Sequence, residues 1–244
     1  GTVTVGTGGT YATLTGAGGL FADINSKVVT GDIVATIISD LTETGANALN
    51  QMAVEGGSWT LTIAPDAATV RNITGSFAGG LIRLNGADRV TIDGRYSNSG
   101  NYLNFVNTAT SGTIAPLQII SLGAGQGAEN VTIRNCTFSN GYIGTTTYGI
   151  FAGSATLGTA AGDNDNLTIR DNVVKKSYYG IYVAGASGAV NDNLNILNNE
   201  VGSTVTADYV YKYGIYGTYI NNADISGNHI FNMSSTTITP AGLY

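Results

Sequence analysis

Side chains that could do acid or base chemistry recur at one position of a repeated sequence phrase, whose copies include residues 129–136 and 165–172. Arg134 and Arg170 occupy equivalent positions in successive copies of this phrase, and Asp93 occupies that position one copy earlier. Clustered carboxylates can bind Ca²⁺, and an arginine beside them can take a proton from the carbon next to a substrate carboxylate. If the chain is an enzyme, Asp93, Arg134 and Arg170 are therefore its candidate catalytic residues.

Four further aspartates lie near this set in the sequence: Asp163, Asp165, Asp171 and Asp192. Most of them fall in Asn-rich loops before strands, where Asp and Asn commonly form turns by bonding to the backbone. This setting favours a structural role, so we predict no metal site and no cofactor, with Ca²⁺ as the alternative. His229, the single histidine, has no Cys, Ser or carboxylate constellation and is expected to be a surface residue.

A second set of candidate residues is aromatic. The phrase Tyr-Gly-Ile-aromatic occurs at 148–151, 179–182 and 213–216, and a variant occurs at 241–244. Alternation along a strand turns the Ile and Leu inward and the rings outward. The predicted ligand-binding rings are Phe151, Tyr182, Tyr216 and Tyr244 in one column, and Tyr148, Tyr179 and Tyr213 in another. Stacked rings would stabilise a parallel sheet, and they would also offer a flat surface to sugar rings or to a partner protein.

The elements that position these side chains follow from a repeat at 129–136, 165–172, 192–199 and 221–228. The closing residues are Cys136, Asn172, Asn199 and Asn228, so the periods are 36 (136 to 172), 27 (172 to 199) and 29 (199 to 228). Repeats of this length with strand-like alternation indicate a solenoid whose core is completed by neighbouring turns. The closing residues are predicted to form a hydrogen-bonded ladder, with Cys136 as a buried thiol.

The two ends of the chain differ from this repeat. Residues 1–30 are predicted to form a cap, with a short helix inside 11–27 because Leu14, Ala17, Phe21 and Ile24 share one helical face. Residues 31–244 are predicted to form the solenoid. The last six residues, 239–244, begin another copy of the aromatic phrase. A solenoid that ends in the middle of a turn exposes the edges of its strands. We therefore expect the solenoid to continue beyond residue 244 or to stack end to end on another molecule.

Composition narrows the classes of partner. The net charge is −6, only 11% of residues are charged, and the chain has ten Lys and Arg residues. Nucleic acids and anionic membranes are disfavoured because neutralising phosphates requires clustered cations. We also expect no membrane span, since no apolar run approaches the required length of about 20 residues. A single cysteine excludes an internal disulfide.

The repeated phrase at 165–174, followed by Gly-Ile-Tyr-Val at 180–183, resembles the right-handed parallel β-helices of the pectin-lyase-like superfamily. The segments 11–14, 31–34 and 84–95 are similar to repeat modules of very large secreted or surface proteins of Gram-negative bacteria. This resemblance implies an all-β, single-stranded right-handed parallel β-helix solenoid. It also implies an extracellular or cell-surface location in a bacterium.

The resemblance leaves the activity open, because that superfamily includes lyases, hydrolases, tailspikes and adhesins. The Gly-His-Gly and Arg-Ile-Lys motifs of its hydrolases do not occur in the sequence. We therefore favour a non-catalytic spacer or adhesin that binds glycans or a neighbouring protein through its aromatic columns. A polysaccharide lyase or glycoside hydrolase is one alternative, and a filament subunit that stacks end to end is the other.

Overall fold

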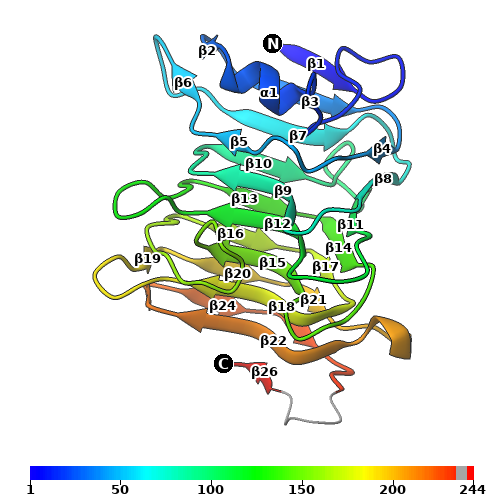
Figure 1. Cartoon of the computed structure of the whole chain (residues 1–244), viewed down its shortest axis with the longest axis vertical. Helices are drawn as coiled ribbons and strands as arrows, with labels where there is room; N and C mark the ends of the chain where they lie inside the picture. Colours follow the sequence, from blue (N-terminus) through cyan, green and yellow to red (C-terminus); the bar gives the residue numbers. More distant parts are fainter. Residues whose placement is uncertain (235–240) are drawn as a thin grey trace.

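The chain folds into a parallel β-solenoid, in which successive turns stack along the long axis (Figure 1). The computed structural model describes residues 1–234 and 241–244, so Thr239 and Pro240 of the last predicted copy lie outside the described residues. Each turn contributes strands to three long sheets, and neighbouring strands of these sheets pair in parallel. The predicted solenoid is confirmed as a parallel, all-β architecture.

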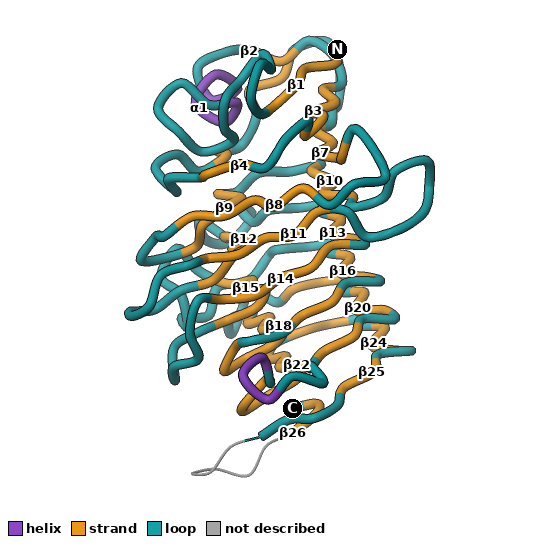
Figure 2. Tube along the Cα trace, turned by 90° about the vertical axis from the view of Figure 1, so that its right-hand side faces the viewer, coloured by secondary structure: helices purple, strands orange, loops and turns teal. Residues whose placement is uncertain are grey.

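Sheet 1 has eight strands, and its order follows the sequence. Its strands are β1 (Thr2–Val5), β3 (Ile33–Ile37), β7 (Leu61–Pro65), β10 (Val90–Asp93), β13 (Thr132–Arg134), β16 (Thr168–Arg170), β20 (Asn195–Leu197) and β24 (Asp224–Ser226). Sheet 2 has seven strands: β4 (Leu41–Thr42), β8 (Arg71–Gly75), β11 (Leu103–Asn107), β14 (Cys136–Asn140), β17 (Val173–Val174), β21 (Glu200–Val201) and β25 (His229–Ile230). Figure 2 shows strands of sheets 1 and 2 following one another down the solenoid.

Sheet 3 also has seven strands and carries the aromatic phrase. Its strands are β5 (Leu49–Asn50), β9 (Gly80–Asn85), β12 (Ala115–Ile120), β15 (Tyr148–Gly153), β18 (Ser177–Ala184), β22 (Val210–Thr218) and β26 (Ala241–Leu243). Two short pairs lie outside the long sheets: β2 (Val28–Val29) with β6 (Ala53–Val54), and β19 (Asn191–Asp192) with β23 (Ile220–Asn221). A 3₁₀ turn covers Thr206–Asp208.

The core fills the inside of the three sheets in layers. Because successive side chains of a strand face opposite sides, alternate residues of each strand point inward. The apolar residues predicted to point inward from sheet 1 are fully buried from Val90 through Ile196. Phe105 and Phe138 of sheet 2 stack inside with their ring centroids 5.2 Å apart. Ala223, which stands in the last copy where Leu194 stands in the copy before it, is exposed, because it precedes β24, the edge strand of sheet 1.

The N-terminal segment contains a shorter helix than the sequence predicted. Helix α1 covers only Leu20–Asn25 and buries Leu20, Phe21 and Ile24. Leu14 is buried as predicted but lies in a loop, and Ala17 is exposed. The loop is fixed instead by the buried Glu43 carboxylate, which accepts the backbone N–H groups of Leu14 and Thr15 at 2.7 Å each. A carboxylate that captures these donors holds the backbone in a non-helical conformation.

Buried asparagines stack where each turn passes from sheet 1 to sheet 2. The Asn172 Oδ1 atom accepts the Cys136 N–H at 3.0 Å. The Asn199 Oδ1 atom accepts both the N–H and the Nδ2 of Asn172, at 3.1 and 3.0 Å, and Asn228 repeats this arrangement with Asn199. Each amide therefore satisfies polar groups of the preceding turn that water does not reach.

Replacing Asn199 by alanine tests the contribution of this ladder. The substitution removes the acceptor for two Asn172 donors and the donor for the Ile169 carbonyl, all in a buried setting. We expect the free energy of unfolding to fall by about 2–4 kcal/mol, since each buried group left unsatisfied costs about 1–3 kcal/mol. Denaturant titration measures the change. Asn195→Ala, on the outer side of β20, is the control and should cost far less; equal losses for both variants would contradict a special role for the ladder.

Candidate functional site

The three residues predicted for acid or base chemistry lie side by side on the outer face of sheet 1. Asp93 of β10, Arg134 of β13 and Arg170 of β16 share one register position on adjacent strands. The Arg134 Nη2 lies 2.8 Å from the Asp93 Oδ2, and the Arg95 Nε lies 2.9 Å from the Asp93 Oδ1. Arg170 turns instead to Asp171, at 2.6 Å. The structure thus brings together the residues that the repeat predicted.

Both carboxylates of this group, Asp93 and Asp171, are already paired with arginines. Burial alone would raise the pKa of Asp93, but hydrogen bonds from Arg95 and Arg134 outweigh it and hold that pKa below its usual value. The same interaction with Asp93 raises the pKa of Arg95. An ionised carboxylate clamped by two guanidinium groups is a strong surface ion pair, and a guanidinium so held keeps its proton. This geometry therefore supplies a structural link between turns rather than a free base.

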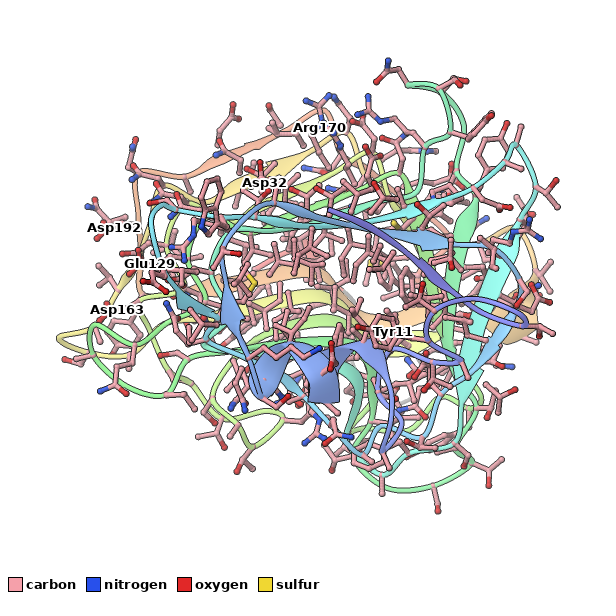
Figure 3. The ribbon with its side chains drawn as sticks, turned by 90° about the horizontal axis from the view of Figure 1, so that it is seen from above. Tyr11, Asp32, Glu129, Asp163, Arg170 and Asp192 are labelled. Atoms are coloured by element: carbon pink, nitrogen blue, oxygen red, sulfur yellow. The ribbon has the colours of Figure 1, made fainter. Side chains whose placement is uncertain are left out.

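A column of carboxylates lies at a different corner of the solenoid. Figure 3, which looks down the long axis, shows Glu129, Asp163 and Asp192 together at one side, away from Arg170. The carboxylates act as turn acceptors: the Asp165 Oδ1 accepts the Asp192 N–H at 2.7 Å, and the Asp163 Oδ2 accepts the Gly125 N–H at 2.5 Å. Among the described residues, no group of three or more His, Cys, Asp or Glu side chains is arranged to hold a metal ion.

The carboxylates of this column, called the acidic column below, repel one another. Burial raises the pKa of Glu129, and the charges of Asp88, Asp165 and Asp163 raise it further. The pKa of Asp165 is also raised, first by burial and then by Asp192 and Asp163, in spite of its backbone hydrogen bond. Asp88 and Glu129 were not among the predicted residues. A signal for them existed, because an acidic residue precedes the strand phrase at 88, 129, 165 and 192.

The aromatic columns lie on the outer face of sheet 3, where alternation placed them. Phe151, Tyr182 and Tyr216 stack on one another with centroid distances of 5.5 and 4.3 Å, and Tyr244 continues the stack at 5.3 Å. In the second column, Tyr148 and Tyr179 stack at 4.9 Å. Tyr213 follows at 5.8 Å with its ring tilted by 39°. The two columns meet edge to face, as in the Tyr179–Tyr182 pair at 5.2 Å.

The accessibility of the rings changes along the columns. Phe151 and Tyr148 were predicted to face outward as binding residues, but they are 0% and 5% exposed. They lie outside the solenoid core in a separate apolar cluster with Leu157, whose loop follows β15. The later rings are accessible, up to 62% for Tyr244. Lys212 extends the surface, with its Nζ 4.9 Å from the centroid of the Tyr213 ring.

The remaining predicted residues lie apart from these sites. Cys136 is fully buried, and burial raises the pKa of its thiol well above the usual value, which makes a thiolate unfavourable. His229 is exposed, and its ring stacks on Phe231 at 4.6 Å. No helix among the described residues is long and apolar enough to cross a lipid bilayer.

The fold and these surfaces define the class of the protein as a parallel β-solenoid with an aromatic face and an ion-paired face. Comparison with family models, with curated proteins and with solved structures returned no match.

The acidic column predicts a stabilising substitution. A raised folded-state pKa means that ionised Glu129 is disfavoured by the fold at neutral pH. We expect Glu129→Gln to raise the free energy of unfolding by about 0.5 kcal/mol at pH 7. The gain should vanish as the pH falls below about 4, where the wild-type carboxyl is protonated in both states. Thermal unfolding across pH measures this, with the exposed Glu200→Gln as control; a loss of stability at pH 7 would contradict the proposed repulsion.

Proposed function

We propose that this chain is a non-catalytic, extracellular β-helix module that binds glycans through the aromatic face of sheet 3. The aromatic face is defined here as Tyr179, Tyr182, Tyr213, Tyr216 and Tyr244. The observation that carries the proposal is the stacking of these rings in two columns whose later members are accessible to solvent. Rigid, partly exposed rings lose little conformational entropy on binding, and their faces match the apolar faces of sugar rings.

The finer assignments belong to the same proposal. We assign the solenoid to the right-handed, pectin-lyase-like β-helices of bacterial surface proteins, which the repeated phrase resembles. The buried face of α1 is suited to cover the first turns, since Leu20, Phe21 and Ile24 belong to the main core cluster. The stacked strands make the module a stiff spacer, and its aromatic face gives it an adhesive surface, either for a polysaccharide or for a neighbouring surface protein.

The ion pairs on sheet 1 argue against catalysis as the principal function. A lyase needs an arginine that can accept a proton, whereas Arg134 is committed to Asp93 and Arg170 to Asp171. Hydrolysis by two carboxyl groups needs both groups to be free of ion pairs and to flank the glycosidic bond that is cleaved. Asp93 is neutralised by two cations, so the group supports the link between strands better than it supports chemistry on a sugar.

A binding and depolymerisation assay tests the proposal. The wild-type chain is passed over immobilised cellulose, chitin, xylan and polygalacturonate, with and without Ca²⁺, while unsaturated and reducing ends are measured in solution. We expect retention on at least one polysaccharide with no new ends and no Ca²⁺ dependence. New ends that disappear in Arg134→Ala and Arg170→Ala would establish the lyase alternative. Loss of retention in a folded chain that instead sediments as growing filaments would favour the end-to-end subunit.

Substitutions in the aromatic face locate the binding surface. Tyr182→Ala and Tyr216→Ala each remove a ring from the first column. We expect each to weaken retention about tenfold, which corresponds to about 1.4 kcal/mol of lost aromatic contact. Tyr96→Ala removes a more exposed ring from a loop between sheets 1 and 2 and should leave retention unchanged. Equal effects of all three substitutions would contradict binding at the aromatic face.

A further inference from the structure

The aromatic columns end abruptly toward the N-terminal turns, and a cavity lies at that point. In the first column, the position of Phe151 is taken by Gln118 on β12 and then by Arg83 on β9. In the second column, the ring of Tyr148 gives way to Ala115 and then to Gly80. The loss of ring volume leaves a cavity of about 290 Å³ on the surface of sheet 3, bordered by Phe77, Arg83, Gln118 and Leu157.

Arg83 differs from every other arginine of the chain in its surroundings. The other five each have a carboxylate oxygen within 3.5 Å. Within the described residues, Arg83 has no carboxylate partner. Its Nη2 donates to the carbonyls of Gly45 and Ala46, at 2.6 and 3.2 Å, and its Nε is buried without an acceptor. Burial lowers the pKa of this guanidinium, in keeping with a cation that no anion compensates.

The Arg83 side chain borders the cavity together with the Phe77 ring and Leu157. Its Nη1 makes no hydrogen bond to a described residue, yet it is not among the buried atoms, so it stays accessible. The guanidinium carbon lies 5.1 Å from the centroid of the Phe77 ring. Phe77 and Leu157 are both partly buried, and an ion pair formed at Nη1 beside them is stronger than one in open water.

The cavity is held open by its own packing. The side chain of Gln118 is 1% exposed, and its Nε2 donates to the carbonyls of Ser154 and Ala155 at 3.0 and 3.1 Å. These bonds fix the loop that carries Leu157. At Gly80 a Cβ atom would come within 2.5 Å of the Gln118 Cβ, so a larger residue would displace the wall. Such preformed walls are typical of small-ligand sites.

We propose that this cavity binds a small monocarboxylate with a compact apolar body, such as an aryl carboxylate. The carboxylate meets the Arg83 Nη1, and the apolar body lies between the Phe77 ring and Leu157. A single ring is the right size, because the volume is at the lower end of ligand pockets, about 300–1,000 Å³. Among the described residues, Arg83 is the single cation that borders the cavity, which matches one negative charge and disfavours phosphates. The site lies outside the aromatic face and is independent of glycan binding.

Benzoate and its neutral isostere benzamide are the probes, and amide chemical shifts of the whole chain are the readout. We expect saturable shifts for the amides around Gly80, Arg83 and Leu157 with benzoate, at a dissociation constant on the order of 1 mM. Benzamide should bind about tenfold more weakly or worse, because it cannot form the charge-assisted bond. Equal binding of the two probes, or no saturation with benzoate well above that concentration, would overturn the proposal.

Three substitutions separate ligand binding from a purely structural role of Arg83. Arg83→Gln should lose benzoate binding by about tenfold or more. If Arg83 serves only to hold the Gly45 and Ala46 carbonyls, Arg83→Gln would shift the melting temperature and leave benzoate binding unchanged, which would refute the site. Arg83→Lys keeps the charge and should retain part of the affinity even if the glutamine variant fails to fold. Arg89→Gln, which alters a half-buried arginine paired with Asp88, is the matched control and should bind benzoate as the wild type does.

Discussion

The structure depends on the parallel register that places each side chain directly over its counterpart in the preceding turn. Parallel strands repeat at about 4.8 Å, so a residue type that recurs in the sequence becomes a physical column. A column is stable only where its members can satisfy one another. Asparagine does so in the buried ladder, because each amide both donates and accepts, as the bonds from Asn172 to Asn199 and from Asn199 to Asn228 show.

The same register has opposite consequences for rings and for carboxylates. Tyrosine rings gain from stacking at 4.3 to 5.8 Å, and their apolar bodies shield the outside of sheet 3. Burial and the neighbouring carboxylates at that spacing raise the pKa of Glu129 and of Asp165, although Asp165 accepts a backbone N–H. On sheet 1 the charges of one column are paired differently: Arg134 binds Asp93 of the preceding strand, and Arg170 of the next strand turns to Asp171.

Much of this architecture could be predicted from the sequence, and the reason is again the repeat. The phrase ending at Asn172 and Asn199 revealed strand faces, ladder and register, because repetition multiplies a weak local signal. Helix α1 was overestimated because the capture of the Leu14 and Thr15 amides by Glu43 is a contact across 28 to 29 residues, which no local pattern reveals. The burial of Phe151 was missed for a similar reason: the covering residue, Leu157, belongs to a loop outside the repeat.

The candidate sites were predictable to different degrees. Register alone brought Asp93 next to Arg134, but the sequence could not show that Arg95 would close the ion pair from its own strand end. Arg83 gave no signal at all, since it stands where the aromatic phrase is absent. In a solenoid, a column that continues unbroken is explained by its contribution to stability, and a column that breaks requires a separate explanation. The replacement of rings by Gly80, Ala115 and an uncompensated arginine is such a break, and it places a charge and a hollow at the same point.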